Sequence, residues 1–242
     1  MSRSVSARLD ESFVALFREA PGAPLPWTAI ATALSLSLED VQAVVARLEL
    51  AGYAFDVSPD RGVAIRERPR FLVHTEVFPC LDTRWLGRVI RFYRTVESTN
   101  DLLLAAAPDD AEGLVVFAEE QTRGRGRQGR RWEAPAGRAL QFSILIRPTR
   151  GVWEASDATL AAAAGMVDGL REATGVTALV RWPNDLSVDG RKLCGILSEY
   201  RTAAGNFVIG IGLNVNQTEE ETPEGGTSLR VLTGRETARG PL

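Results

Sequence analysis

The sequence predicts an α+β fold, and three observations lead to that class. Three helical segments followed by a hairpin open the chain, strand patterns outnumber helical ones after Phe71, and Asp189-Gly190 joins two apolar runs. An Asp-Gly pair in that position is a strong signal for a two-residue hairpin, so part of the second sheet is expected to be antiparallel. Strands grouped in this way, with helices between them, indicate a mixed sheet rather than a purely parallel one.

The first 68 residues are predicted to form a small helical domain that ends in a hairpin. Apolar residues recur at helical spacing, and residues that cap or break helices stand at the expected ends. The expected helices cover 9–20, 29–34 with Thr28 as N-cap, and 38–51 between Ser37 and Gly52, and the hairpin strands cover 53–57 and 63–65. This order resembles a winged helix-turn-helix, so residues 1–68 are expected to bind operator DNA or another protein.

Charge does not favour the DNA alternative. Residues 1–70 hold 8 Arg against 9 Asp plus Glu. The expected recognition helix, 38–51, carries Glu39, Asp40 and Glu49 beside a single basic residue, Arg47. Because release of counterions from phosphates supplies most non-specific affinity for DNA, we expect that affinity to be weak.

Residues 69–242 are predicted to form a second domain built on a mixed sheet. Ser98-Thr99-Asn100 is expected to be a capping cluster before a helix over 102–107, and Ser156 to cap a longer helix that ends near Gly175. The expected strands are 89–96, 114–118, 139–146, 178–182, 186–188, 193–197 and 207–215.

Composition excludes several classes of protein. The chain has 242 residues, 45% of them hydrophobic, and a net charge of −3, which argues against bulk electrostatic binding to nucleic acid or membranes. No apolar stretch approaches the roughly 18 residues of a membrane span, so we expect a cytoplasmic protein with no membrane partner. Two distant cysteines, Cys80 and Cys194, with one histidine, His74, provide neither a disulfide framework nor a zinc cage. Both cysteines are expected to be packing residues.

The segment 123–131 carries five arginines and no acidic residue. Its glycines satisfy G-x-G-x-x-G after a strand, but residues 130–135 cannot begin the helix that a dinucleotide-binding turn requires. Such a loop repels itself unless an anion neutralises it, and glycines let backbone N–H groups approach phosphate oxygens. We therefore expect a disordered loop that folds over an anionic ligand. An RNA-binding segment and a solvated surface loop are the alternatives.

A second cluster surrounds the only lysine among the 28 basic residues, Lys192. A position that stays lysine in an arginine-rich chain suits a compact, mobile ammonium, and chance is the alternative explanation. Asn184 and Asp185 follow a strand that ends at Pro183, where they can hold hydrated magnesium and nucleotide phosphates, or form an ordinary turn. Gly195 lets a ligand lie against the backbone.

Taken in order, these motifs resemble those of the biotin protein ligases. The matching segments are Ser98-Thr99-Asn100, Glu120-Gln121-Thr122, the arginine-rich loop with Trp132, RWPNDL from Arg181, KLCGIL from Lys192 and GIGLN from Gly210. The resemblance covers about residues 90–230, and the first domain is similar to that of the bifunctional members, which also repress the biotin operon. It implies ATP and Mg²⁺ as cofactors and biotin as substrate. It further implies formation of biotinyl-5′-AMP and transfer of biotin to a lysine of biotin carboxyl carrier protein.

The resemblance also implies a role for each candidate site residue. Lys192 and Arg127 are the expected catalytic residues, with Lys192 bridging the biotin carboxylate and the α-phosphate. The expected biotin-binding residues are Ser98, Thr99, Asn100, Gln121, Arg125, Gly126, Arg127, Lys192 and Gly195. The expected ATP-binding residues are Arg130, Trp132, Asn184, Asp185 and Asn214, with Asp185 also the metal ligand.

Some features depart from the family pattern. Arg123 replaces a small residue, Arg181 replaces the commoner lysine, and the chain ends at Leu242, where the family continues into a small β-barrel domain. Residues 69–242 are therefore expected to form the catalytic domain without that barrel. A biotin-sensing repressor with little ligase activity, or a lipoate or octanoyl transferase relative, remains an alternative. Relatives pair through a sheet edge, so a ligand-promoted homodimer is a further expectation.

Overall fold

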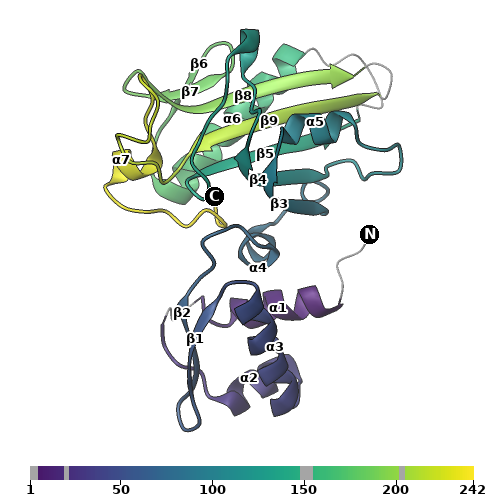
Figure 1. Ribbon diagram of the computed structural model, residues 1–242, viewed down its shortest axis with the longest axis vertical. Helices are drawn as coiled ribbons and strands as arrows, with labels where there is room; N and C mark the ends of the chain where they lie inside the picture. The colour runs from purple at the N-terminus through teal and green to yellow at the C-terminus, as the bar shows by residue number, and fades with distance from the viewer. Residues whose placement is uncertain (1–4, 19–21, 148–154, 202–204) are drawn as a thin grey trace. The chain divides into compact units, whose positions relative to one another are not determined.

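A computed structural model describes residues 5–18, 22–147, 155–201 and 205–242 and divides the chain into two compact units (Figure 1). The first unit runs from Met1 to Leu81 and the second from Asp82 to Leu242. Each unit contains its own cluster of buried apolar side chains. The α+β class is confirmed, because helices pack on a mixed seven-stranded sheet in the second unit.

The first unit has the predicted order of three helices and a hairpin. Its elements are α1 (Val5–Ala15), α2 (Trp27–Leu34), α3 (Leu38–Leu50), and the antiparallel strands β1 (Ala54–Ser58) and β2 (Gly62–Glu67). Ser37 caps α3 as expected, since its hydroxyl accepts from the Asp40 N–H at 3.1 Å. In return, the Asp40 carboxylate accepts from the Ser37 N–H, which completes a capping box. Phe13, Ile30, Val44 and Leu48 close the core between the helices.

Four predicted helix starts or ends in the chain were wrong. Thr28 lies inside α2, because Pro26, whose ring fixes φ near the value a helix start needs, occupies the N-cap. Ser156 likewise lies inside α6 (Ala155–Thr174) rather than before it. The helix after Ser98 is α5 (Thr99–Leu104), which begins earlier than expected because the Ser98 hydroxyl accepts from the Asp101 N–H. The first helix ends at Ala15, and residues 19 and 20 of its predicted end lie outside the described residues.

The first unit also extends beyond the expected boundary at residue 68. A short helix, α4 (His74–Val77), and a 3-10 turn, η1 (Phe78–Cys80), pack against α1. The Tyr53 hydroxyl lies 2.7 Å from Thr75 Oγ1 and donates to Glu76. These buried contacts hold residues 69–81 on the first unit.

The second unit is a seven-stranded sheet with the order β3-β4-β5-β9-β8-β7-β6. Only β3 and β4 of these are parallel, and the other neighbours pair antiparallel. The strands are β3 (Ile90–Val96), β4 (Val115–Gln121), β5 (Ala139–Ile146), β6 (Leu179–Arg181), β7 (Asp185–Val188), β8 (Arg191–Arg201) and β9 (Asn206–Asn214). Asp189 and Gly190, which join β7 to β8, both have positive φ, as the predicted hairpin turn requires.

Helices cover both faces of this sheet. Successive side chains of a strand point to opposite faces, so on β8 Gly195 and Glu199 share one face and Ser198 the other. The Ser198 hydroxyl meets Thr159 of α6 at 2.7 Å. Glu199 meets Asn100 of α5 at 2.7 Å. The α5 face is therefore where the predicted site residues gather.

The last part of the chain returns to the sheet through α7 (Leu229–Thr233). A buried ion pair follows, in which both terminal nitrogens of Arg239 meet the Glu119 carboxylate of β4, at 2.8 and 3.1 Å. Within the described ranges, no single helix has the length and apolarity of a membrane span. Only α2 and α3 taken together do, and they are bent by 95° at the break between them.

Candidate active site

A cavity of about 600 Å³ opens on the α5 face of the sheet. It lies between the start of α5, the loop after β4, and strands β5, β8 and β9. Thirteen of the fourteen predicted site residues line it, although they come from five separate stretches of sequence: Ser98, Thr99, Asn100, Gln121, Arg125, Gly126, Arg127, Arg130, Trp132, Asn184, Asp185, Lys192 and Gly195.

The remaining predicted residue, Asn214, lies at the buried end of β9 and is not among the side chains that line the cavity in the described structure. Its Nδ2 donates to Thr227 O at 3.0 Å, and its Oδ1 accepts from Gln217 Nε2 at 2.8 Å. Both ends of the amide therefore hold the C-terminal segment, and the predicted contact of Asn214 with ATP has no support in this geometry.

The arginine-rich loop is folded back on itself rather than open. Gly126 N donates to Arg130 O at 2.8 Å, and Trp132 N donates to Gly124 O at 3.1 Å. A Cβ atom on Gly124 would come within 2.3 Å of Trp132 O, so this glycine is required for closure. Gly126 is extended and its nearest neighbour would be 3.6 Å from a Cβ, so the protein itself leaves room there.

Trp132 closes the loop by lying on the floor of the cavity. Gly195 and Gly212 stand opposite each other on β8 and β9, and together they leave a flat space for the indole. A Cβ on Gly212 would fall 2.4 Å from the ring, and one on Gly195 would fall 3.4 Å from it. The indole N–H donates to Gln141 Oε1 at 3.2 Å. Two glycines, which leave space for the ring, and one hydrogen bond thus fix the position of Trp132.

Amides and hydroxyls form the neutral end of the cavity. Gln121 Oε1 accepts from Thr99 N at 2.9 Å and from Thr99 Oγ1 at 3.1 Å, and Gln121 Nε2 donates to Gln141 Oε1 at 3.1 Å. Ser143 Oγ lies 2.7 Å from Thr99 Oγ1 and 2.6 Å from Asn100 Oδ1. These bonds orient each amide in advance, which suits recognition of a polar, uncharged ring.

Gln141 and Ser143 are residues that the sequence analysis missed. Both are buried on β5. Gln141 accepts hydrogen bonds from Gln121 and Trp132, and Ser143 bonds Thr99 and Asn100. The signal was present: two polar residues two apart in an otherwise apolar strand share one face, and buried polar groups need partners.

The lysine sits beside the predicted metal ligand. Lys192 Nζ approaches Asp185 Oδ1 at 2.6 Å as an ion pair, and its angle is not that of a well-directed hydrogen bond. The backbone of Lys192 is held on both sides, by Gly225 O and the Thr227 N–H, so only its side chain is free to move. Behind it, burial raises the pKa of the Cys194 thiol to about 12, so this cysteine stays neutral and acts in packing, as expected. Cys80 is exposed, so the expectation that it is a packing residue was wrong.

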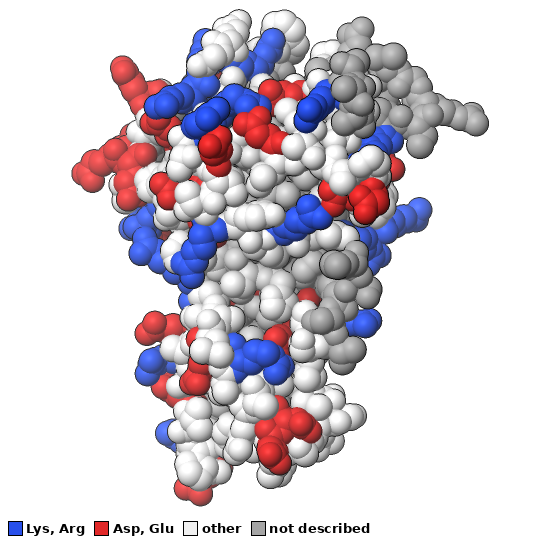
Figure 2. Space-filling model, turned by 45° about the vertical axis from the view of Figure 1, so that its right-hand side comes forward, with Lys and Arg blue, Asp and Glu red and all other residues white. Residues whose placement is uncertain are grey.

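Charge gives the cavity its character. Six basic side chains line it, against the acidic Asp185 and Glu224: Arg125, Arg127, Arg130, Arg131, Arg181 and Lys192. Elsewhere both signs are interspersed over the surface, as Figure 2 shows for one face. Across the parts of the chain that the structure describes, Arg127, Arg130 and Arg181 form no ion pair. The cavity is therefore suited to a ligand that carries several negative charges at one end.

Comparisons with known proteins agree with this site. The chain matches the biotin/lipoate A/B protein ligase family over residues 92–216. It is 30% identical over 220 residues to the bifunctional ligase/repressor BirA of Bacillus subtilis, which covers 89% of this chain and 68% of that protein. It is 40% identical over 138 residues to the biotin–[acetyl-CoA-carboxylase] ligase of Mycobacterium tuberculosis, which covers 54% and 51%.

Among solved structures, the biotin protein ligase from Aquifex aeolicus in complex with biotin and ATP superimposes with a TM-score of 0.56 at 30% identity. The match covers 62% of this chain and 63% of that one. The chain thus spans between 51% and 68% of the length of these relatives. It belongs to the biotin/lipoate A/B protein ligase family.

Proposed function

We propose that the protein is an ATP-dependent biotin protein ligase. The observation that carries the proposal is the cavity itself, which has a neutral end of pre-oriented amides and hydroxyls and a cationic end made by the loop and Lys192. Biotin has the complementary polarity, with an uncharged ureido ring at one end and a carboxylate at the other. The ligase names of the relatives support the same assignment.

In the first step, a carboxylate oxygen of biotin attacks the α-phosphorus of ATP. The bond from that phosphorus to the bridging oxygen breaks, so biotinyl-5′-AMP and pyrophosphate form. Because a carboxylate and a triphosphate repel each other, the main task of the site is to neutralise and position them. Lys192 reaches both groups from β8, while Arg127 and Arg130, with no protein counter-ion in the described structure, meet the phosphates from the loop.

In the described part of the chain, Asp185 is the one aspartate that lines the cavity. It fits a magnesium site in which the protein supplies few of the ligands. Among the described residues, no three His, Cys, Asp or Glu side chains gather as a metal centre. Mg²⁺ in nucleotide sites needs only one or two carboxylates, because phosphate oxygens and water complete its shell. When bound, the ion would neutralise phosphate charge. Asp185 would hold the ion, while the Lys192 ammonium beside it is proposed to contact the reacting carboxylate.

In the second step, a lysine amine of biotin carboxyl carrier protein attacks the acyl carbon of the mixed anhydride, and AMP leaves. The carrier protein is therefore the proposed protein partner, and the cytoplasm the proposed location. A homodimer is proposed to form through a sheet edge, for which β3 and β6 are the candidates.

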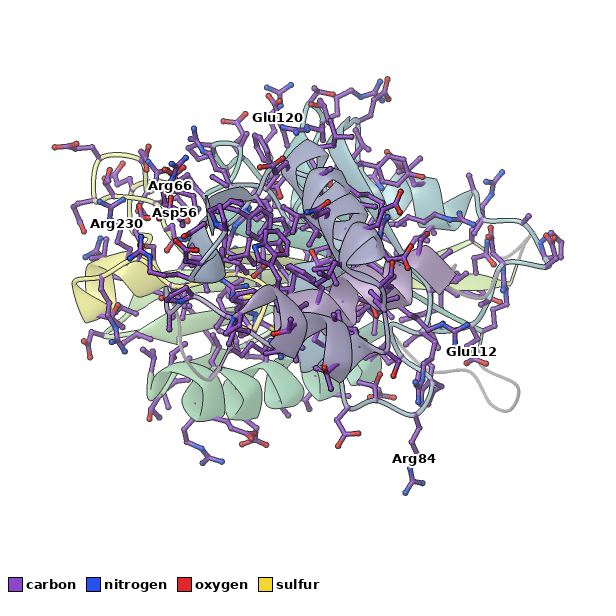
Figure 3. The ribbon with its side chains drawn as sticks, turned by 90° about the horizontal axis from the view of Figure 1, so that it is seen from below. Asp56, Arg66, Arg84, Glu112, Glu120 and Arg230 are labelled. Atoms are coloured by element: carbon purple, nitrogen blue, oxygen red, sulfur yellow. The ribbon has the colours of Figure 1, made fainter. Side chains whose placement is uncertain are left out.

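The test is detection of biotinyl-AMP by mass spectrometry, with pyrophosphate release as the rate. Wild-type protein with biotin, ATP and Mg²⁺ is expected to form the adenylate, and Lys192→Ala to lose it with the fold intact. Arg84→Ala is the matched control, because it removes one cation whose side chain projects into solvent (Figure 3) and which is not among the residues that line the cavity. Adenylate formation by Lys192→Ala near the wild-type rate would refute the role of the lysine.

Binding of operator DNA by the first unit is the second candidate function. The order of three helices and a hairpin and the repressor names of relatives favour it. Arg47 is the only basic residue of α3, and its Nη2 forms an ion pair with Asp10 Oδ1 of α1 at 2.5 Å. Helix α3 therefore presents no unpaired cation to DNA phosphates. A gel shift with DNA from upstream of biotin genes at moderate salt, with and without biotinyl-AMP, tests this function. Absence of a shift in both conditions excludes it.

A further inference from the structure

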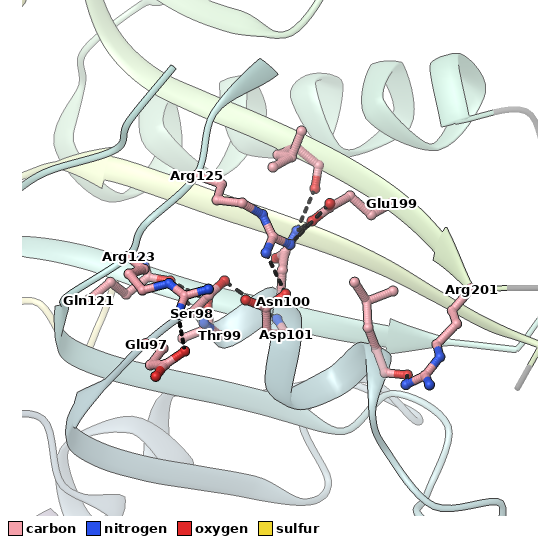
Figure 4. A network of polar contacts seen from close by, with 12 residues as sticks. Glu97, Ser98, Thr99, Asn100, Asp101, Gln121, Arg123, Arg125, Glu199 and Arg201 are labelled. Atoms are coloured by element: carbon pink, nitrogen blue, oxygen red, sulfur yellow. Dashed lines mark hydrogen bonds and ion pairs between the residues drawn. The ribbon is translucent and has the colours of Figure 1, made fainter. Parts of the chain in front are cut away.

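Two carboxylates that belong to none of the predicted site residues meet the arginine-rich loop. Arg125 Nη1 lies 2.5 Å from Asp101 Oδ1 on α5, and Arg125 Nη2 lies 2.8 and 3.0 Å from the two oxygens of Glu199 on β8 (Figure 4). Partial burial acts against the charge of Arg125, but these hydrogen bonds outweigh it and raise the pKa of the guanidinium. Both terminal nitrogens of the guanidinium therefore donate to protein carboxylates.

Glu199 has a second partner on the other side of the site. Its Oε2 accepts from Asn100 Nδ2 at 2.7 Å, while Leu197 O accepts from the same nitrogen at 3.3 Å. These two acceptors decide which way the amide faces, because the reverse orientation would set its oxygen against the carboxylate. The amide lies in the space that the missing side chain of Gly210 leaves, since a Cβ there would be only 2.2 Å from Asn100 Oδ1.

We propose that Glu199, assisted by Asp101, is a positioning residue that pins the ligand-binding loop to the sheet and orients Asn100 at the same time. As far as ligand is concerned, this inference rests on the proposed function. One side chain would then couple the cationic wall of the cavity to its neutral end. Arg125 becomes an anchor of the loop, and neutralisation of the anions falls to Arg127, Arg130 and Lys192.

The opposite view is that the two carboxylates occupy Arg125 only until an anionic ligand takes it from them. The two views predict opposite effects of removing the charge. If Glu199 positions the loop, Glu199→Gln binds ligand more weakly. If Glu199 competes with the ligand for Arg125, the same substitution binds ligand more tightly.

The first experiment needs no ligand. Hydrogen exchange of the peptide covering 124–132 is measured in wild-type protein, in Glu199→Gln and in Glu112→Gln, which removes one exposed carboxylate elsewhere on the unit (Figure 3). Glu199→Gln is expected to speed exchange in the loop about tenfold, the scale of one lost charge-assisted bond at a partly exposed site. Glu112→Gln should leave it unchanged. Unchanged exchange in Glu199→Gln overturns the proposal.

A double-substitution cycle separates this role from a general loss of stability. In an Arg125→Gln background, Glu199→Gln should change loop exchange less than twofold, because the bond it breaks is already gone. An equal effect in both backgrounds would show that Glu199 acts elsewhere.

The last measurement is pyrophosphate release. Glu199→Gln is expected to raise KM for biotin about tenfold while kcat changes less. A lowered KM establishes competition and overturns the proposal. If the wild-type protein forms no adenylate, the proposed function fails, but the exchange result still decides whether Glu199 holds the loop.

Discussion

Replacing Gly212 by alanine would place a methyl group where the indole of Trp132 lies. The new Cβ would fall 2.4, 2.5 and 2.8 Å from three ring carbons, whereas ordinary contacts begin at 3.4 Å. The ring must therefore retreat by about 1 Å from the sheet. That movement strains the 3.2 Å bond from the indole N–H to Gln141. Overpacking of this kind costs about 1–3 kcal/mol.

Gly126 offers the matched control from the same site. An alanine there would have its nearest neighbour at 3.6 Å, on a backbone with φ of −117° that any residue adopts. Gly126→Ala should therefore leave stability unchanged or raise it slightly, by up to about 1 kcal/mol. If the ligand lies against this stretch of backbone, as the family resemblance implies, the same variant binds biotin and ATP more weakly.

Calorimetric melting of the second unit is the assay. For a domain of this size, 1 kcal/mol shifts Tm by roughly 2–4 °C, so Gly212→Ala should melt between about 2 and 12 °C lower than wild type. It should also form adenylate more slowly, because Trp132 is displaced. A Gly212→Ala protein that melts and reacts like wild type would refute the packing of the indole on the glycine pair. A fall in Tm for Gly126→Ala as large as that for Gly212→Ala would refute the claim that the protein leaves room at Gly126.

Three further predictions follow from contacts of the second unit. Arg239→Met removes the partner of buried Glu119 and should destabilise the unit by about 3 kcal/mol in urea unfolding, whereas adding Glu119→Gln should recover part of that loss; full additivity would contradict the pairing. Burial works against the ionised form of Asp110, but hydrogen bonds from a backbone N–H and from Arg91 outweigh it and lower the pKa of its carboxyl. Its contribution to stability is thus present above the ordinary value of 3.8 and is lost as the pH falls through the lowered pKa. Asp110→Asn should therefore be less stable than wild type at pH 7 and equal to it in strong acid, and a constant difference across that range would count against the assignment. Biotin and ATP together should slow hydrogen exchange over 123–131, and exchange unaffected by both ligands would argue that the loop does not close on them.

The sequence predicted helices and strands well where capping or turn residues stand at the ends of an apolar pattern with the right spacing. The strand 139–146 was predicted with the bounds that β5 has, and Ser37, Ser98 and the Asp189-Gly190 turn act as predicted. Thr28 failed as a cap because Pro26 already sets the backbone for a helix start two residues earlier. Intrinsic preference of a single residue is a weak guide when its neighbour constrains φ.

The sequence predicted the residues that line the site but not the residues that hold them in place. The motifs identified thirteen residues that line one cavity. Glu199 and Gln141 belong to no motif, and their roles depend on which strands become neighbours. The sheet places β5 beside β9 and β9 beside β8, an order that does not follow the chain. Pairings between distant segments leave little trace in a single sequence.

The central claim is that the arginine-rich loop and Lys192 act on one ligand. A crystal structure of the protein with bound biotinyl-5′-AMP tests it most directly. The account predicts the adduct inside the cavity, with its ring beside Gln121 and its acyl phosphate about 3 Å from both Lys192 Nζ and a donor of the loop. An adduct bound elsewhere, or one that the loop contacts while Lys192 remains paired with Asp185 and apart from it, would contradict the account.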